Sequence, residues 1–371
     1  MMLKGQRQRS PFSRDLERIL ARFDQESIAL DAQRAGQGAA WSWDDEQDVR
    51  YAQHDSRLGN VLHIFHREWH GIRAAAGSLP GRKLVIPEVT LSEALLNVLA
   101  LQIQDENPYR IIFHGFSANM ASLIRWLHDA GLTDRLFAVF HGSPAQWWNE
   151  VERKFVFEMI DMAQNGYFSG IHIMKNGMEL PNAPLFKPLI YNVSPKHGMK
   201  QEAMRKSDRV AAFVPGWNNW IKNVFGSAYG ASLSEYVDEV WAFASGLELP
   251  FPMQEKLIIL KPTNREETFE RYLASRVTLN VSLIDCHPMV NVEAQSLGRP
   301  CVRSDLYLDQ YEDHDYVKLV SVGHNNSPYE IRKTVEKVLD MPHKEIQDMV
   351  LDYQGKIDAL ALDRYAEFLK I

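Results

Sequence analysis

Residues 277–305 read VTLNVSLIDCHPMVNVEAQSLGRPCVRSD, and this stretch decides the fold. Apolar residues alternate over 277–283, which predicts a strand. The loop that follows places the carboxylate of Asp285 just beyond that strand. A helix is predicted over 289–297, with Gly298 where a helix-ending glycine belongs, and a short strand follows at 301–302. This order of strand, loop, helix and strand indicates a parallel α/β sheet.

Two acidic residues, Asp285 and Glu293, frame this unit with seven residues between them. Ligands of open α/β sheets bind beyond the carboxyl ends of the strands, where the amino end of the next helix favours anions. A carboxylate in a place that favours phosphate is best explained by ligand hydroxyls that donate hydrogen bonds to it. The combination indicates a nucleotide sugar as the ligand.

The same residues resemble the E-x7-E element of retaining glycosyltransferases with the GT-B fold (glycosyltransferase family 4-like, group 1), which usually reads E-G-x-P-x-x-x-x-E-A-x-A-x-G-x-P-V-V. The chain keeps the spacing, with Glu293-Ala294, Gly298-Arg299-Pro300 and Val302 in register. Asp285 replaces the first Glu, and Cys286 replaces the usual Gly. The resemblance implies two Rossmann-like domains that face each other across a cleft.

The bulk composition is that of an ordinary globular protein. The chain has 371 residues, enough for two domains, because one core rarely exceeds about 250–300 residues. Its formal net charge of −7 argues against general nucleic-acid binding. No apolar run approaches the ~20 residues of a membrane span, and no secretory signal is visible. The two cysteines form no disulfide framework, so we expect a cytoplasmic protein.

Strands and helices alternate twice along the chain. In the first half, strands are predicted at 61–65, 83–87, 110–113, 136–140, 170–174 and 189–192, and helices at 91–104, 118–130 and 145–163. In the second half, strands are predicted at 210–214, 240–243, 257–260, 277–283, 301–302 and 318–322, and helices at 265–275, 289–297, 329–339 and 343–371.

The predicted domains follow from this alternation. They are a partly helical N-terminal extension, a first Rossmann-like domain, a polar linker, a second Rossmann-like domain and a C-terminal helix, at 1–57, 58–195, 196–208, 209–345 and 346–371. The resemblance implies that the last helix crosses back to the first domain, that the first domain binds the acceptor and that the second binds the donor. The N-terminus is basic and amphipathic, which favours a helix packed on the domain; contact with the inner face of a membrane is the alternative.

A second motif follows the strand predicted at 210–214. In the resembling family the first strand of the second domain ends in G-R-x-x-x-x-K-[GN], whose Arg and Lys bind the donor diphosphate. Gly216, Lys222 and Asn223 stand at the matching places, but Trp217 occupies the position of the Arg. A departing nucleoside diphosphate gathers negative charge that a fixed cation stabilises. Lys222 can supply that cation, and Arg265 or Lys261 is the candidate replacement for the missing Arg.

Histidine residues follow two strands of the first half. The resembling family places a His-Gly or His-Asp pair after the fourth strand, near the donor sugar, and His141 matches in position and type. His114 follows the preceding strand and is a second candidate. Gly71 and Arg73 lie in a predicted glycine-containing loop, which lets backbone N–H groups approach a phosphate or the acceptor. A turn glycine with a solvated arginine is the equally weighted alternative.

The sequence thus predicts a glycosyltransferase that moves a sugar from a nucleoside-diphosphate sugar to an acceptor hydroxyl, with retention and without a metal or other cofactor. By the resemblance, Glu293 binds the ribose, Asp285 the sugar and Lys222 the diphosphate, while the acceptor meets His141. The residues assigned to donor binding beside these are Gly216, Asn223, Pro288, Met289, Val290 and Arg265. The acceptor is a glycan, a lipid-linked glycan or another hydroxyl compound, with surface polysaccharide or glycoconjugate synthesis as the expected setting.

Three other functions are compatible with the same pattern. A non-catalytic partner that binds a sugar nucleotide or glycan would explain the absence of the Arg at Trp217. A sugar-nucleotide epimerase of the same fold would need acids placed to move protons on the sugar. A two-domain ligand-binding protein of the periplasmic type is disfavoured by the missing signal peptide and by the pair Gly216 and Lys222.

Overall fold

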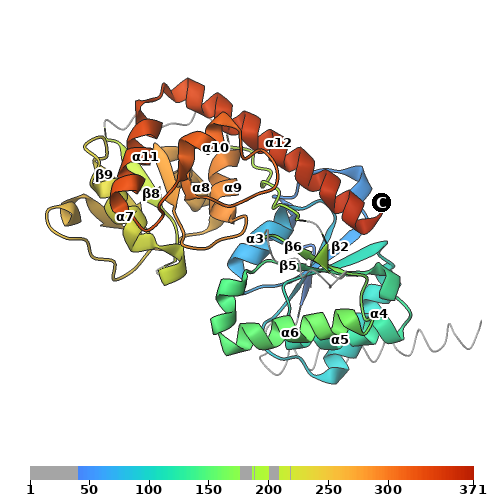
Figure 1. The fold of residues 1–371 in the computed structure, drawn as a ribbon. Coiled ribbons are helices and arrows are strands. Elements are labelled where there is room, and N and C mark those ends of the chain that lie inside the picture. Colours follow the sequence, from blue (N-terminus) through green and yellow to red (C-terminus); the bar gives the residue numbers. More distant parts are fainter. Residues whose placement is uncertain (1–40, 176–185, 188, 200–208, 218) are drawn as a thin grey trace, which may run out of the picture.

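The computed structural model describes residues 41–175, 186–187, 189–199, 209–217 and 219–371, and Figure 1 shows these residues as two lobes. The first lobe holds a seven-stranded sheet of order β1-β3-β2-β4-β5-β6-β7, and the second a six-stranded sheet of order β10-β9-β8-β11-β12-β13. All strand pairs are parallel except β1 with β3. The predicted N-terminal helix and most of the predicted linker lie outside the described residues.

The elements of the first lobe have these bounds. Its strands are β1 Ser42–Trp43, β2 Val61–His66, β3 Arg82–Ile86, β4 Arg110–His114, β5 Leu136–Phe140, β6 Ile171–Ile173 and β7 Phe186–Lys187. Its helices are α2 Glu46–Val49, α3 His70–Ser78, α4 Glu93–Glu106, α5 Ala118–Asp129 and α6 Glu150–Gln164.

The elements of the second lobe follow the same alternation. Its strands are β8 Ala211–Val214, β9 Glu239–Ala242, β10 Leu257–Ile259, β11 Val277–Asn280, β12 Cys301–Ser304 and β13 Ser321–Val322. Its helices are α7 Val224–Ser232, α8 Arg265–Ala274, α9 Met289–Ser296, α10 Asp315–Val320, α11 Pro328–Asp340 and α12 His343–Leu369. A 3-10 turn, η4, spans Trp220–Lys222. Gly298 adopts φ +68° after α9, as its predicted place at the helix end requires.

Both faces of the first sheet are buried because alternate strand residues pack on different helices. Leu62 and Ile64 of β2 belong to the core cluster shared with α4, α5 and α6, which lie on one side of the sheet (Figure 1). Val61 of β2 and Ile112 of β4 point to the opposite side, into a cluster that continues into the second lobe. Continuous apolar strands of this kind are typical of parallel sheets covered on both faces.

The C-terminal helix α12 joins the lobes. It leaves the second lobe and ends on the first (Figure 1), where the ring of Phe368 meets the edge of Phe137 at 4.9 Å between centroids. Arg110 Nε donates to the carbonyl of Leu369 at 2.8 Å, and Arg364 Nη1 to that of Leu189 at 2.5 Å. The predicted return of this helix to the first domain is confirmed.

One predicted strand is wrong, and another is too long. Residues 189–192 form no strand but the connection that runs beside α12, where the N–H of Asn192 donates to His287 Nδ1 at 2.9 Å. Residues 318–320 belong to helix α10, and only Ser321–Val322 forms a strand. The apolar residues of α10 recur at helical spacing. In so short an apolar run, periodicity alone does not distinguish a helix from a strand. The helix predicted from residue 145 begins at Glu150, after a 3-10 turn at Pro144–Trp148.

Candidate functional site

Lys222 and Asp285 meet at the carboxyl ends of two neighbouring strands, β8 and β11. Lys222 Nζ lies 2.9 Å from Asp285 Oδ2, and the Asp285 side chain is only 7% exposed. The N–H of Cys286 donates to Asp285 Oδ1 at 3.0 Å. Burial works to lower the pKa of Lys222, but the Asp285 carboxylate outweighs it, so the pKa is raised and the ammonium stays charged. The pair is a fixed cation beside a fixed carboxylate.

Glu293 forms a second pair of the same kind. It lies on α9, and its Oε1 accepts a hydrogen bond from Arg265 Nε at 3.1 Å and forms an ion pair with Arg265 Nη2 at 3.0 Å. The hydroxyl of Tyr272 lies 3.5 Å from Glu293 Oε2. Burial raises the pKa of Glu293, and Arg265 opposes that shift. Arg265 therefore brings a cation from the start of α8 to the second acid of the motif.

The loop before α7 holds Lys222 in place through local structure. Asn223 has a left-handed backbone with φ +47°, and its amide donates to the carbonyls of Val281 at 3.0 Å and Asn325 at 2.7 Å. A Cβ on Gly216 would lie 3.1 Å from Val224 Cγ2, so the chain passes tightly there. Asn223, expected to bind the donor, uses its side chain to anchor this loop.

Trp217 adds no charge to the site. Its side chain is 63% exposed, and its ring lies 6.4 Å from that of His70 across the two lobes, with the planes 24° apart.

The first lobe contributes His141, which follows β5. The thiol of Cys286 donates to the carbonyl of His141 at 3.0 Å, which brings the Asp285 loop against the first lobe. Burial raises the pKa of Cys286 to about 12, so the thiol keeps its proton for this hydrogen bond. Met289 and Val292 of α9 pack with Ala75 of α3. The loop that carries Asp285 and the helix that carries Glu293 thus both contact the first lobe.

The predicted glycine-containing loop after the first strand is wrong, because Gly71 lies in helix α3. Space is open around Gly71, since an added Cβ would meet nothing within 4 Å. Arg73 is engaged elsewhere: its Nε and Nη2 donate to the two carboxylate oxygens of Asp48 at 2.8 and 2.9 Å. Its guanidinium ties α3 to α2, and these contacts do not support a phosphate role.

Sequence reasoning missed the partners of His114. His114 is fully buried and lies between His63 and His141, with 2.9 Å between ring nitrogens on each side. A partial signal existed, since His114 ends one strand and His141 directly follows another, while His63 lies within a third. Converting that signal into a contact requires knowing that β2, β4 and β5 are adjacent in the sheet.

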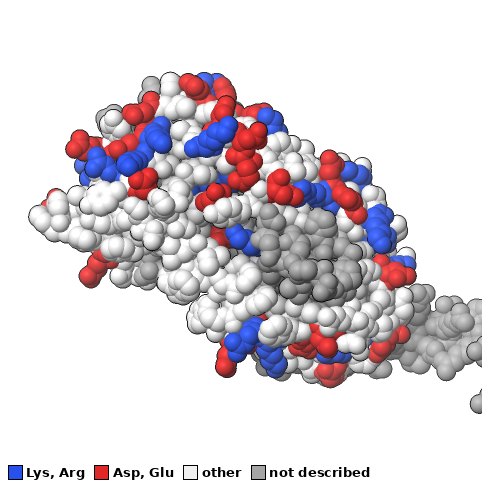
Figure 2. Space-filling model, viewed as in Figure 1, with Lys and Arg blue, Asp and Glu red and all other residues white. Residues whose placement is uncertain are grey.

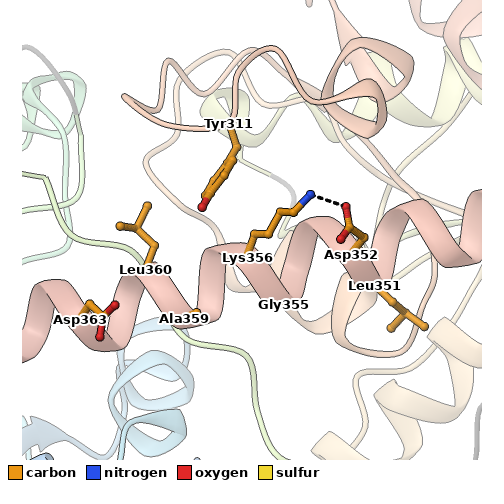
Figure 3. A pocket seen from close by; sticks show the side chains of 8 residues that line it. All are labelled: Tyr311, Leu351, Asp352, Gly355, Lys356, Ala359, Leu360 and Asp363. Atoms are coloured by element: carbon orange, nitrogen blue, oxygen red, sulfur yellow. Dashed lines mark hydrogen bonds and ion pairs between the residues drawn. The ribbon is translucent and has the colours of Figure 1, made fainter.

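A groove of about 530 Å³ lies away from these acids, along α12. It is lined by Tyr311, Leu351, Asp352, Gly355, Lys356, Ala359, Leu360 and Asp363 (Figure 3). Its cation, Lys356, pairs with Asp352 at 2.6 Å, as the dashed line in Figure 3 marks. The groove contains none of the residues of the two motifs, so we place the candidate site at the face between the lobes.

The charged surface in Figure 2 shows acidic and basic side chains interspersed over α10–α12, and few charges over α7 and the loop after β9. Pairs such as Lys333–Glu330 at 2.7 Å account for the mixture. Among the described residues, no group of three or more His, Cys, Asp or Glu side chains is arranged to hold a metal ion. Within the same part of the chain, no helix is long and apolar enough to cross a membrane.

Comparison with known proteins identifies the architecture. No family model matches the chain, and no curated protein matches its sequence. Among solved structures, E. coli trehalose-6-phosphate bound with UDP-2-fluoro glucose aligns over 84% of this chain and 99% of its own, with a TM-score of 0.52 and 11% identity. The UDP-forming α,α-trehalose-phosphate synthase from Burkholderia vietnamiensis covers 84% of this chain and 97% of its own, with a TM-score of 0.54 and 10% identity. The chain has a GT-B fold.

A third similar structure is a trehalose-6-phosphate synthase that was analysed with bisubstrate glycomimetics to study glycosyltransfer with retention. It covers 84% of this chain and 99% of its own, with a TM-score of 0.54 and 10% identity. At such identities the likeness establishes the two facing Rossmann-like domains of the GT-B fold.

Buried histidines make the stability of this GT-B protein depend on pH. Burial lowers the pKa of His66 to about 4 and the pKa values of His141 and His287 to about 3; it lowers those of His63 and His114 well below the usual value. Below pH ~6.5 the unfolded chain binds protons that the folded chain does not, so the free energy of unfolding falls as pH drops. We expect a fall of up to about 1.4 kcal/mol per pH unit for each histidine between pH 6.5 and about 4, measured by urea unfolding.

Two variants separate this effect from general acid sensitivity. His287→Asn keeps an acceptor for the N–H of Asn192 and removes one titrating ring, so the slope against pH becomes shallower. His54→Gln changes an exposed histidine and leaves the slope as it was. Equal stability of the natural protein at pH 7 and pH 5 would contradict the linkage.

Proposed function

We propose that the protein is a retaining glycosyltransferase that takes a sugar from a nucleoside-diphosphate sugar and transfers it to an acceptor hydroxyl. The observation that carries the proposal is the presence of two acid–cation pairs, Lys222–Asp285 and Arg265–Glu293, on the donor-side lobe of a GT-B fold. A nucleotide sugar offers a diphosphate to both cations and hydroxyls to both acids. It therefore fits a site where each cation already neighbours an acid.

The donor would bind with its parts distributed over these pairs. Glu293 would accept hydrogen bonds from the ribose hydroxyls, and Asp285 from sugar hydroxyls. Lys222, Arg265 and the N-terminus of α9 would face the diphosphate. The Pro288 N-cap of α9 provides no side-chain hydrogen bond, which leaves the first N–H groups of Met289 and Val290 free of a side-chain cap.

Transfer would proceed on one face of the sugar. The acceptor hydroxyl would approach from the side of His141, and a departing phosphate oxygen would take its proton, so that retention needs no nucleophile from the protein. Lys222 would stabilise the negative charge that gathers on the leaving diphosphate. The contact between Cys286 and His141 would help to keep water away from the donor. Because the similar proteins are described as UDP-forming or bound with UDP-2-fluoro glucose, UDP is the first nucleotide to test.

A thermal-shift screen with UDP, GDP, ADP and their common sugar conjugates tests donor binding. A ligand at about 100 times its dissociation constant stabilises the fold by roughly 2.7 kcal/mol, and we expect this from one base only. The donor that shifts Tm should then be hydrolysed slowly without an acceptor. A well-folded sample that responds to no nucleotide would contradict the proposal.

The second candidate is a non-catalytic partner that binds a sugar nucleotide. It is favoured by Trp217, which is exposed and uncharged where the resembling family has its phosphate-binding Arg. This protein would give the same thermal shift but no hydrolysis or transfer of the bound sugar. The hydrolysis assay therefore separates the two functions.

A further inference from the structure

Three histidine rings form a hydrogen-bonded row inside the first lobe. His63 of β2 is paired in register with Ile112 of β4, and His114 of β4 with Val139 of β5. Because side chains two residues apart share a face of a sheet, His63, His114 and His141 all lie on the same face, each displaced by two residues from its neighbour. His63 Nδ1 lies 2.9 Å from His114 Nε2, and His114 Nδ1 lies 2.9 Å from His141 Nε2.

A backbone carbonyl fixes the direction of every hydrogen bond in this row. His63 Nε2 lies 2.8 Å from the carbonyl oxygen of Pro80, which only accepts, so Nε2 carries the proton. A neutral imidazole has one donor and one acceptor nitrogen, so His63 Nδ1 accepts and His114 Nε2 donates. By the same step His114 Nδ1 accepts and His141 Nε2 donates. The remaining nitrogen, His141 Nδ1, then carries a lone pair and no proton.

The row is neutral because burial outweighs the one contact that favours a charge, the Pro80 carbonyl at His63. His63 and His114 are fully buried, and burial lowers their pKa values well below the usual value. Lys83 lies beside His63 on β3 and adds a further lowering, since its ammonium repels a second positive charge. Burial also lowers the pKa of His141 to about 3. The deduced tautomers therefore hold across the neutral pH range.

His141 is the end of the row that a ligand can reach. His63 and His114 are fully buried, whereas His141 retains partial exposure. Its Nδ1 has no hydrogen-bond partner among the described residues and is not one of their buried unpartnered atoms. The carbonyl of the same residue contacts Cys286 of the second lobe. Nδ1 is thus the polar atom that His141 offers to a ligand between the lobes.

We propose that His63 and His114 are positioning residues that lock His141 in the Nε2–H tautomer, so that its Nδ1 accepts a hydrogen bond from a hydroxyl of the donor sugar. A ligand group at this place must donate a hydrogen. A carboxylate or phosphate oxygen cannot, and its lone pairs would face the lone pair of Nδ1. The row therefore selects for a hydroxyl. The ligand half of this inference rests on the proposed transferase function, and the tautomer half does not.

Two-bond ¹H–¹⁵N NMR of histidine-labelled protein tests the lock directly. In the natural chain we expect the Nε2–H signature for His63, His114 and His141, with Nδ1 unprotonated. His63→Asn keeps an oxygen near the position of Nδ1 that accepts from His114, so the signature of His141 persists. His63→Leu removes that acceptor, and His141 then shows a mixture of tautomers. A proton on Nδ1 of His141 in the natural chain would overturn the lock.

The ligand half is tested with UDP-glucose and four analogues in which one sugar hydroxyl is replaced by fluorine, which cannot donate. We expect one position where fluorine raises Kd about tenfold in the natural chain and in His63→Asn, but not in His63→Leu. Binding of UDP alone stays within about twofold in all three proteins. A merely structural role would weaken UDP and UDP-glucose together.

The outcomes distinguish the two halves. Equal binding of all four analogues to the natural chain, with the tautomer as expected, overturns the selection of a hydroxyl and leaves the lock. If neither UDP nor UDP-glucose binds, the uridine donor and its contact with His141 are both contradicted. The NMR spectrum still tests the tautomer of His141. Should His63→Leu fail to fold, the spectrum of the natural chain and its fluorine series still decide both halves.

Discussion

Replacing Lys222 by methionine should lower kcat for sugar transfer, or for slow hydrolysis of the donor, about 10²–10³-fold. This is the usual loss when one fixed group that stabilises transition-state charge is removed. Lys222 Nζ lies 2.9 Å from Asp285, and methionine fills much of the same volume without the charge. Steady-state kinetics with the donor found in the thermal-shift screen measures the effect.

The same substitution leaves the buried Asp285 without its cation, so part of any loss could come from destabilisation. The double variant Lys222→Met, Asp285→Asn removes the stranded charge and should recover Tm without recovering kcat. Lys333→Met is the matched control, because Lys333 forms an exposed ion pair with Glu330 on α11 and should leave both quantities unchanged. A Lys222→Met protein with full kcat would remove Lys222 from the mechanism.

Replacing Glu293 by glutamine should raise the Kd of the nucleotide about 100-fold. A carboxylate that accepts two hydroxyl hydrogens makes two charge-assisted hydrogen bonds, and a neutral amide offers one acceptor oxygen and no charge. Glu293 is 8% exposed, so the lost bonds are not replaced by water. Isothermal titration with the nucleotide measures the change, and the thermal shift should disappear with it.

Glu270→Gln provides the comparison for Glu293→Gln, because Glu270 is an exposed acid on α8, the helix that carries Arg265. It should bind nucleotide like the natural chain. Loss of the 3.0 Å pair with Arg265 will lower the stability of Glu293→Gln without ligand, so Tm shifts are compared with each variant's own baseline. Unchanged nucleotide affinity in Glu293→Gln would mean that Glu293 serves only to hold Arg265.

Local pattern was enough to predict most of the fold. The strands of both lobes are short apolar runs, and a parallel sheet buries such runs on both faces wherever they lie. The unit at 277–305 forms the predicted strand, loop, helix and strand, although β11 ends at Asn280 rather than at residue 283. Asp285, Glu293 and Lys222 could be singled out because their spacing from glycine and proline residues matches the motifs of the resembling family.

Sequence pattern failed to predict secondary structure where a segment's conformation depends on residues that are distant in the sequence. Residues 70–78 contain two glycines, which disfavour a helix interior, so the segment reads as a glycine-containing loop in the sequence. The segment is helical because it packs on β2 and α9, and because Arg73 is held by Asp48, 25 residues earlier. The loop predicted to contain Gly71 and Arg73 is therefore a helix.

The sequence alone determined that this protein has two parallel α/β units, with Lys222 and Asp285 in loops that follow strands and Glu293 in the next helix, because those features depend on neighbours within about thirty residues of chain. Only the tertiary structure decided which cation faces which acid, that Cys286 contacts His141 from 145 residues away, and that His63, His114 and His141 form one row. Periodicity defines which face of a strand a residue occupies but not which strand lies beside it, and the order β3-β2-β4-β5 that aligns the histidines is set by how the whole sheet packs.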